Sequence, residues 1–368
     1  MSTICGVEIE GYNSRGEGVS RLDDGRVVFV PNTARGDVLE IRLTEVKPRV
    51  ARAEATRVIK PSPYRAAVDC PVYPRCGGCD FRHITYEEEL WAKLRRVNDT
   101  LRRIGGLAVE AREILSTGHV DGYRSKAVLH TDGAVRGFYA RHSHDIVGID
   151  RCRLLTDDIN NALKAAPEGG DLTLRSGRNG TDPPLEEELD GLVFGISGFF
   201  QVNTEAALLL FQKAREYAAM SKSETLVDLY CGVGALTLFV GRDARRAYGI
   251  ELDPEAAEAA RNNAGRNGLS HMEFITADAG KWECGAGRPD CVIVDPPRGG
   301  LSDGAARKIL ELSPGRLVYV SCDPATLARD IRRLEGYSVQ EICAVDMFPR
   351  TANVECCCLM SAAPGKRR

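Results

Sequence analysis

Strand and helix patterns alternate from residue 199 to the C-terminus, and this alternation constrains the fold more than any other feature of the sequence. Short apolar runs typical of buried strands are each followed by a segment of helical character; among them are "TLVDL", "AYGIEL", "CVIVD" and "LVYVS". Regular strand–helix alternation predicts a doubly wound α/β sheet with right-handed crossovers. We therefore expect an α/β domain over residues 199–368.

The two preceding segments have different patterns. Residues 1–62 read as four or five short strands with a hairpin reversal at Asp24-Gly25, which predicts a small OB-like β-barrel of a kind that often binds oligonucleotides. Residues 63–198 contain a cysteine cluster, a helix that begins after Thr85 and ends at Gly105-Gly106, and then mostly strands. We expect a central mixed α+β domain there.

The sequence has no apolar run of the roughly 20 residues that cross a bilayer and no secretory signal, so we expect a cytoplasmic protein without a membrane partner. In that compartment thiols stay reduced, and the thirteen cysteines are not expected to form a disulfide framework. Metal binding and nucleophilic chemistry remain as explanations for some of them.

Basic residues gather in two places although the net charge is −3. The segment from Arg42 to Arg65 contains seven basic residues and two acidic ones. A second group of basic residues extends from Lys93 to Arg103. Such stripes can neutralise the phosphates of RNA, although a solvated face is the commoner explanation.

A glycine-rich turn after the first strand of the α/β segment suggests a nucleotide-type cofactor. In "DLYCGVGALT" Gly232 and Gly234 are present, but Thr237 stands where a dinucleotide fingerprint has its third glycine. Glu251 ends the next strand and can bind a ribose diol. An adenosine ligand without a pyrophosphate, such as S-adenosylmethionine, fits this pattern, with Asp278 at the adenine; ordinary strand-to-helix turns are the alternative.

Two reactive side chains end neighbouring strands. Asp295 ends "VIVD" at the carboxyl edge of the predicted sheet, and Cys322 ends the following strand just before a helix N-terminus. A cysteine so placed can have a lowered pKa and act as a thiolate nucleophile. A buried, inert cysteine is the alternative.

The motifs "GFFQVN", "DLYCGVG", "VDPPRGG", "VSCDPATLARD" and "FPRTANVE" resemble the RNA (uracil-5-)-methyltransferase family over nearly the whole chain. The resemblance implies a Rossmann-like S-adenosylmethionine-dependent domain behind a TRAM-like barrel. It implies that Cys322 adds to uracil C6, that Glu355 removes the C5 proton, and that Asp295 contacts cofactor and uracil. The cofactor residues would be Gln201, Asp228, Tyr230, Gly232, Gly234, Glu251, Asp278 and Asp295.

The cysteine cluster "CPVYPRCGGC" supplies three thiols, from Cys70, Cys76 and Cys79, where tetrahedral sites need four ligands. No second C-x2-C knuckle exists, and composition alone leaves zinc and iron–sulfur open. The family resemblance implies Cys152 as the fourth ligand and a 4Fe-4S cluster. Because the reaction needs no electron, we expect the cluster to act as a structural staple near an RNA-facing surface.

The sequence also departs from the family pattern and leaves alternatives. Ala235 replaces an often polar residue, and Cys356–Cys358 replace β-branched or apolar ones; we interpret the latter as small side chains of a last strand. The barrel and cluster resemble the 23S rRNA enzymes of the family more than the tRNA enzymes, which implies 23S rRNA as substrate, with tRNA as the alternative. A non-catalytic RNA-binding iron–sulfur protein is a further alternative, and Arg298 in "DPPR" argues against an amine-directed methyltransferase. No obligate protein partner is evident.

Overall fold

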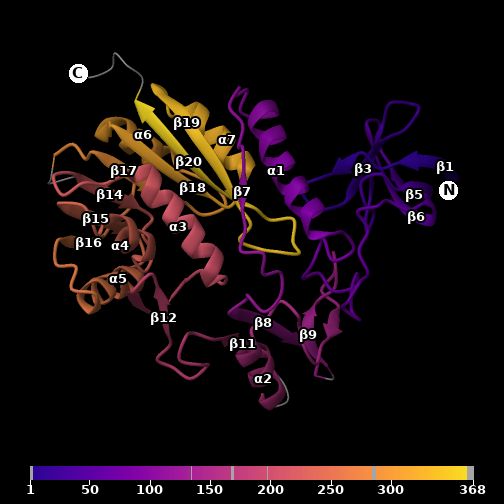
Figure 1. The fold of residues 1–368 in the computed structure, drawn as a ribbon, viewed down its shortest axis with the longest axis horizontal. Helices are drawn as coiled ribbons and strands as arrows, with labels where there is room; N and C mark the ends of the chain where they lie inside the picture. The colour runs from indigo at the N-terminus through magenta and orange to yellow at the C-terminus, as the bar shows by residue number, and fades with distance from the viewer. Residues whose placement is uncertain (1–2, 134, 167–169, 197, 284–286, 363–368) are drawn as a thin grey trace.

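The computed structural model describes residues 3–133, 135–166, 170–196, 198–283 and 287–362. Figure 1 shows the N-terminal sheet on one side of the molecule and the α/β sheet on the other, with the small sheets of the central segment below them. The helix α1 (Tyr86–Arg103) lies between the two larger parts.

The N-terminal part is a six-stranded sheet rather than the four or five strands expected. Its strands, in the sheet order β1-β5-β6-β4-β3-β2, are β1 (Thr3–Glu8), β5 (Val38–Val46), β6 (Val50–Lys60), β4 (Val27–Val30), β3 (Gly18–Arg21) and β2 (Gly11–Tyr12). Strands β3 and β4 pair antiparallel across the turn at Gly25, whose φ of +85° suits glycine, so the predicted hairpin is confirmed. Val28, Val30, Leu39 and Ile41 form its buried core.

The central segment begins with α1, which starts where the sequence predicts, because the Thr85 hydroxyl accepts a hydrogen bond from the backbone N–H of Glu88. A four-stranded sheet follows in the order β10-β9-β8-β11, together with a β12–β13 hairpin. The remaining elements are β7 (Ile114–Leu115), β8 (Lys126–Thr131), β9 (Arg136–Tyr139), β10 (Ile146–Gly148), α2 (Asp157–Ala165), β11 (Leu172–Arg175), β12 (Glu186–Leu189) and β13 (Leu192–Gly195).

The C-terminal part is the predicted α/β sheet, with strand order β16-β15-β14-β17-β18-β20-β19-β7. The first five strands are parallel, and β20 runs antiparallel to both of its neighbours. The elements in chain order are α3 (Thr204–Ala218), β14 (Thr225–Leu229), α4 (Ala235–Gly241), β15 (Arg246–Glu251), α5 (Pro254–Arg266), β16 (Met272–Thr276), β17 (Cys291–Val294), α6 (Asp303–Leu312), β18 (Arg316–Ser321), α7 (Pro324–Arg333), β19 (Tyr337–Val345) and β20 (Glu355–Ala362).

Strand β20 shows how the sheet is buried on both faces. Cys357 belongs to the hydrophobic core on one side, whereas Cys356 and Cys358 belong to the core on the other. All three side chains are fully buried, which confirms the interpretation of "CCC" as small core residues. The twelve described cysteines are all free thiols.

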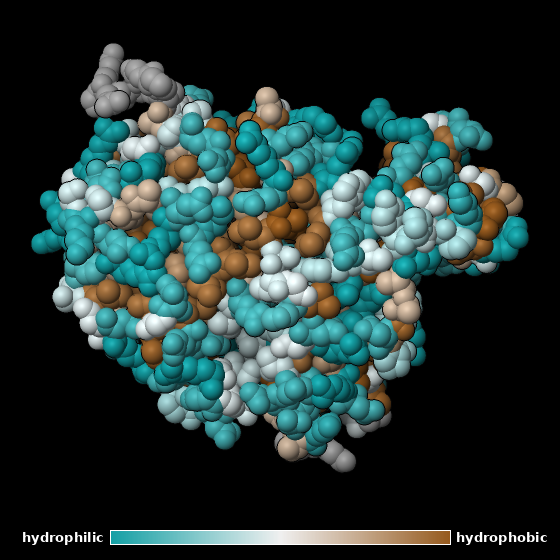
Figure 2. All heavy atoms as spheres, viewed as in Figure 1, coloured by the Kyte–Doolittle hydropathy of each residue, from teal (hydrophilic) through white to brown (hydrophobic). Residues whose placement is uncertain are grey.

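The α/β sheet also includes one strand from the central segment. Strand β7 pairs parallel with β19 at the sheet edge, and α1 packs against α7. The sheet therefore includes residues N-terminal to the boundary expected at 198/199. Figure 2 shows hydrophobic residues gathered in the middle of this face, between the α/β sheet and the N-terminal sheet.

The basic stripes are largely neutralised within the chain. Five of the seven basic residues between Arg42 and Arg65 form ion pairs, namely Arg42–Glu54, Lys47–Glu45, Arg52–Glu17, Arg57–Glu40 and Arg65–Asp37. Lys93 of the second group is buried rather than exposed to RNA. Across the described residues, no helix is both long and apolar enough to span a bilayer.

Candidate active site

Three predicted catalytic side chains meet at one end of the α/β sheet. Asp295 directly follows β17, Cys322 directly follows β18, and Glu355 opens β20. In the antiparallel ladder Ser321 pairs with Cys356, so the next residues, Cys322 and Glu355, come together at the same end. The order of strands therefore brings residues sixty positions apart into one site.

Burial controls the ionisation of this group. Burial, and then the charges of Glu355 and Asp295, raise the pKa of the Cys322 thiol to about 11. Burial and Asp295 raise the pKa of Glu355 to about 8, and burial alone raises the pKa of Asp295 to about 6. The expected lowering of the Cys322 pKa at the α7 N-terminus is therefore wrong for this structure, because desolvation and two carboxylates outweigh the helix end.

Arg298 is a residue of this site to which sequence reasoning gave no role. Its positive charge opposes the rise in the pKa of both Cys322 and Glu355. The side chain is exposed on the loop after Asp295. The sequence does contain a feature that could have indicated this role: a basic residue directly follows the two prolines after Asp295.

The glycine-rich turn bends sharply after β14. Tyr230, Gly232 and Gly234 all have positive φ, at +71°, +53° and +83°. A side chain added at Gly232 would meet nothing within 4 Å, whereas one at Gly234 would lie 3.0 Å from Ala260 Cβ. Gly232 therefore leaves space on the open side of the turn, and Gly234 permits close packing against α5.

A cavity of about 590 Å³, which we call the cofactor cavity, opens beside this turn. Gly232 and Glu251 line it, together with Phe199 and the first turn of α5. The carboxylate of Glu251 accepts hydrogen bonds of 2.9 Å from the backbone N–H groups of Gly232 and Asp253. These bonds fix the carboxylate at the wall of the cavity.

Asp228 lies near the C-terminal end of β14 and has one buried carboxyl oxygen without a hydrogen-bond partner among the described residues. The Thr237 hydroxyl donates a 2.6 Å hydrogen bond to Oδ2, while Oδ1 is buried and has no partner among the described residues. Burial raises the pKa of Asp228 to about 8. A buried polar atom without a partner in the protein is a place where a bound ligand or water can complete the hydrogen bonding.

Of the predicted cofactor residues, Gly232 and Glu251 line this cavity, whereas Asp228 and the others lie outside its lining. Asp278 accepts a 2.8 Å hydrogen bond from the Gly280 N–H in the loop after β16. Gln201 is half-buried two residues before Asn203, whose side chain caps α3. Tyr230 begins the glycine turn, and its N–H donates to the carbonyl of Ile250. Ala235 opens α4.

The four predicted metal ligands line a second cavity of about 810 Å³, the cysteine cavity. Burial raises the pKa of Cys76, Cys79 and Cys152, and nearby cysteine sulfurs add to the rise in each. Within the described ranges, no three His, Cys, Asp or Glu side chains converge closely enough to hold one metal ion. The four thiols thus share a cavity without forming the compact geometry of a mononuclear site.

Family models match the N-terminal and the C-terminal parts of the chain. The TRAM domain model matches residues 3–56, and the tRNA (uracil-5-)-methyltransferase model matches residues 281–363. A general methyltransferase domain model matches residues 226–311. The last two cover the glycine turn and the three catalytic strand ends.

Full-length similarities agree with these matches. RNA methyltransferases of Bacillus cereus and of Nostoc sp., both named as uncharacterized, are 33% and 34% identical over 96% and 95% of this chain and 96% and 94% of their own. The crystal structure of Pyrococcus abyssi tRNA (uracil-54, C5)-methyltransferase with S-adenosyl-L-homocysteine superposes with a TM-score of 0.75 at 26% identity. The superposition covers 97% of this chain and 100% of the archaeal chain.

Proposed function

The chain belongs to the S-adenosylmethionine-dependent RNA (uracil-5-)-methyltransferase family, and on that premise we propose that Cys322, Glu355 and Asp295 carry out C5-methylation of a uridine. Family membership disfavours the non-catalytic alternative.

The proposed reaction begins at Cys322. Its thiolate forms a bond to uracil C6, and the electron pair of the C5–C6 double bond moves toward the ring carbonyl, which makes C5 nucleophilic. S-adenosylmethionine would supply the methyl group that bonds to C5, and the electron pair of the broken sulfur–methyl bond would leave with S-adenosylhomocysteine. Glu355 takes the proton from C5, the C5–C6 double bond re-forms, and the bond from C6 to the Cys322 sulfur breaks, which releases the thiolate.

One observation carries this proposal: Glu355 lies beside Cys322 with a pKa raised to about 8. A base with a pKa near the working pH both accepts a proton effectively and is available to do so. An exposed glutamate, with its ordinary pKa of about 4.3, would be a weaker base. Arg298 is suited to stabilise the thiolate and the developing negative charge on the uracil.

We propose cofactor contacts first for the residues at the cofactor cavity and then for residues farther from it. Glu251 would bind the ribose hydroxyls, Gly232 would allow close approach, and Asp228 Oδ1 would accept from the ammonium group. Gln201, Tyr230, Gly234, Asp278 and Asp295 are proposed as further cofactor contacts or supports. Because the target base must reach Cys322 between strand ends, it would leave its stack.

For the RNA substrate we propose 23S rRNA first, because the N-terminal TRAM domain and the cysteine cluster together resemble the rRNA-directed enzymes of the family. Uridine 54 of tRNA is the second candidate, favoured by the full-length similarity to the archaeal enzyme of that name. Mass-spectrometric mapping of 5-methyluridine in rRNA and tRNA, from cells with and without the gene, tests both. Loss of the mark from tRNA alone would overturn the rRNA assignment, and loss from neither would overturn the function.

For the cysteine cavity we propose a 4Fe-4S cluster held by Cys70, Cys76, Cys79 and Cys152. Four sulfurs around one ion at about 2.3 Å would crowd together, whereas a cluster brings its own iron and sulfide and spaces its ligands widely. The proposal is supported by the family resemblance and by the four cysteines, which line one cavity, although no metal-binding group is found among the described residues. Iron content and visible absorbance of anaerobically purified protein test this, with Cys5→Ser, an exposed cysteine, as control. Stoichiometric zinc without iron would refute it.

A further inference from the structure

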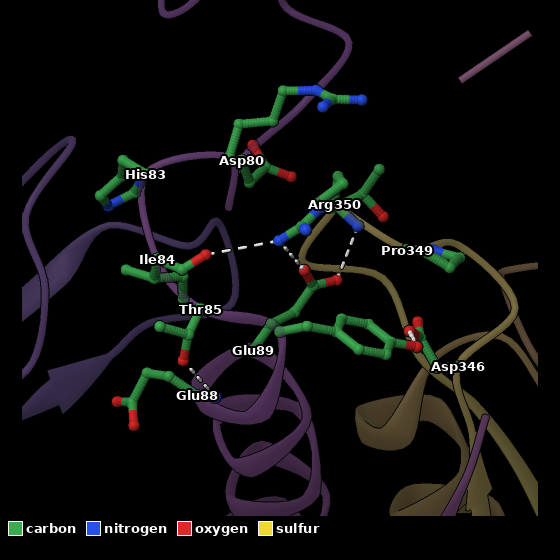
Figure 3. Close-up of polar contacts among 12 residues, drawn as sticks. Asp80, His83, Ile84, Thr85, Glu88, Glu89, Asp346, Pro349 and Arg350 are labelled. Atoms are coloured by element: carbon green, nitrogen blue, oxygen red, sulfur yellow. Dashed lines mark hydrogen bonds and ion pairs between the residues drawn. The ribbon is translucent and has the colours of Figure 1, made fainter. Parts of the chain in front are cut away.

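The loop of residues 346–354, which leads from β19 into Glu355, is held by buried charges of α1. Asp346 accepts hydrogen bonds from the Tyr86 hydroxyl at 2.7 Å and from Lys93 Nζ at 2.5 Å. The backbone N–H of Arg350 donates to Glu89 Oε1 at 2.7 Å. Figure 3 shows Glu89 reaching from the first turn of α1 toward Arg350, with Asp80 nearby.

Asp80 holds the same loop from the opposite side. Its Oδ2 accepts a 2.8 Å hydrogen bond from the backbone N–H of Ala352. Its own N–H, with that of Phe81, donates to the carbonyl of Arg350 at 2.8 and 3.1 Å. Arg350 has a φ of +69°, a costly conformation for a non-glycine residue, so these bonds stabilise a backbone that would not otherwise be favoured.

Asp80 is itself fixed by the cysteine loop. Arg141 Nη1 donates to Asp80 Oδ1 at 2.7 Å, and the Arg141 guanidinium also donates to the carbonyl of Cys79. Cys79 and Ala352 both line the cysteine cavity. Asp80 is thus the shared contact between the cysteine loop and the loop before Glu355.

Between Ala352 and Glu355 lie two residues, of which Val354 is buried with 1% exposure. If Ala352 is displaced, Glu355 is therefore displaced with it, because the connecting backbone is short and partly buried. We propose that Asp80 is a positioning residue for Glu355, which couples the cysteine loop to proton removal from C5. This inference rests on the proposed role of Glu355.

The coupling acts on one step of the reaction. Cys322 and Asp295 follow β18 and β17, and neither has a contact with Asp80 among the described interactions. Addition to C6 and methyl transfer then proceed without Asp80, whereas release of the methylated RNA slows. Misplacement of a reacting group by about 1 Å can cost about 100-fold in rate.

The test follows single turnovers with methyl-labelled cofactor and an RNA that carries the target uridine. Adduct formation is measured as labelled, denaturant-resistant protein–RNA complex, and resolution as free labelled RNA. Asp80→Ala is compared with Asp80→Asn, which keeps an acceptor for the Ala352 N–H. Asp69→Ala is the matched control, because Asp69 adjoins Cys70, pairs with Arg82 and Arg153, and has no described contact with residues 346–354.

We expect Asp80→Ala to slow resolution about 10-fold to 100-fold while adduct formation changes less than about 3-fold. Asp80→Asn should fall between Ala and wild type, and Asp69→Ala should match wild type. Equal losses in both steps, or the same stalling in Asp69→Ala, would overturn the inference. If Asp80→Ala does not fold, the ratio of the two rates in Asp80→Asn decides, since a ratio equal to that of wild type overturns the coupling.

The experiment also separates this inference from the proposed function. Wild-type protein must form 5-methyluridine, and Glu355→Gln must stall as a methylated adduct. If either fails, the role of Glu355 is wrong; if both hold and Asp80 variants resolve normally, only the role of Asp80 is wrong.

Discussion

Glu355 and Cys322 lie together at the end of the β18–β20 ladder, where the carboxylate adds to the effect of burial in raising the thiol pKa. Burial and nearby carboxylates therefore favour the protonated form of each group in the free protein. Catalysis needs both without their protons, although at different steps. This relationship makes the reaction depend on pH in a defined direction.

We expect resolution of the methylated adduct to accelerate as the pH rises toward 8. Below the Glu355 pKa of about 8 the active base fraction falls about tenfold per pH unit. The folded chain holds this proton more tightly than the unfolded chain, so its contribution to stability is present below the ordinary value of 4.5 and is lost as the pH rises through about 8. Adduct decay measured from pH 6 to pH 9 checks this, and a flat profile would contradict it.

Arg298→Ala should slow adduct formation by about 10-fold. The substitution removes the positive charge that opposes the rise in the Cys322 pKa, so less thiolate is present at a given pH. Arg298→Lys keeps a cation and should lose less activity. Stopped single turnovers at several pH values check this, and a loss in Arg298→Ala that higher pH does not relieve would argue against the ionisation account.

The two glycines of the turn should respond differently to alanine. Gly234→Ala places a Cβ 3.0 Å from Ala260 at positive φ and should cost about 1–3 kcal/mol of stability. Gly232→Ala faces open space and should cost about 1 kcal/mol, while it weakens S-adenosylhomocysteine binding. Denaturant unfolding and calorimetric titration separate the two effects. Equal binding in wild type and Gly232→Ala would remove Gly232 from the cofactor contacts.

Lys93→Met should destabilise the chain by about 3–5 kcal/mol, because it leaves the buried carboxylate of Asp346 without its cation and Glu89 with only Arg350, 3.6 Å away. Burial lowers the pKa of Lys93, but the two carboxylates outweigh burial and raise this pKa above its ordinary value. The control Arg95→Met breaks an exposed pair with Asp99 and should cost less than about 1 kcal/mol. Denaturant unfolding checks both, and equal effects would show that the buried group contributes little.

The α/β sheet could be predicted from the sequence because each strand–helix unit is local. Strand ends that carry Asp295, Cys322 and Glu251 follow from apolar runs and their boundaries, and the hairpin at Gly25 follows from its turn residues. Strand β7 could not be predicted. Its pairing with β19 joins segments more than two hundred residues apart, and two residues give no periodicity.

The ionisation of buried groups could not be predicted from the sequence. The pKa of Cys322 depends on burial and on Glu355, which lies far away in sequence, so a helix N-terminus alone gave the wrong direction. Lys93 appeared in a basic cluster but pairs with Asp346 from the other end of the chain. Such partners become visible only once the fold places them.

The most direct test of the account is the fate of the RNA adduct in Glu355→Gln. We expect this variant to accumulate a denaturant-resistant complex in which the RNA carries the labelled methyl group, with a bond from Cys322 to uracil C6 identified by mass spectrometry of the linked peptide. The double variant with Cys322→Ala should form none. A methylated complex linked through another residue, or free 5-methyluridine produced by Cys322→Ala, would contradict the account.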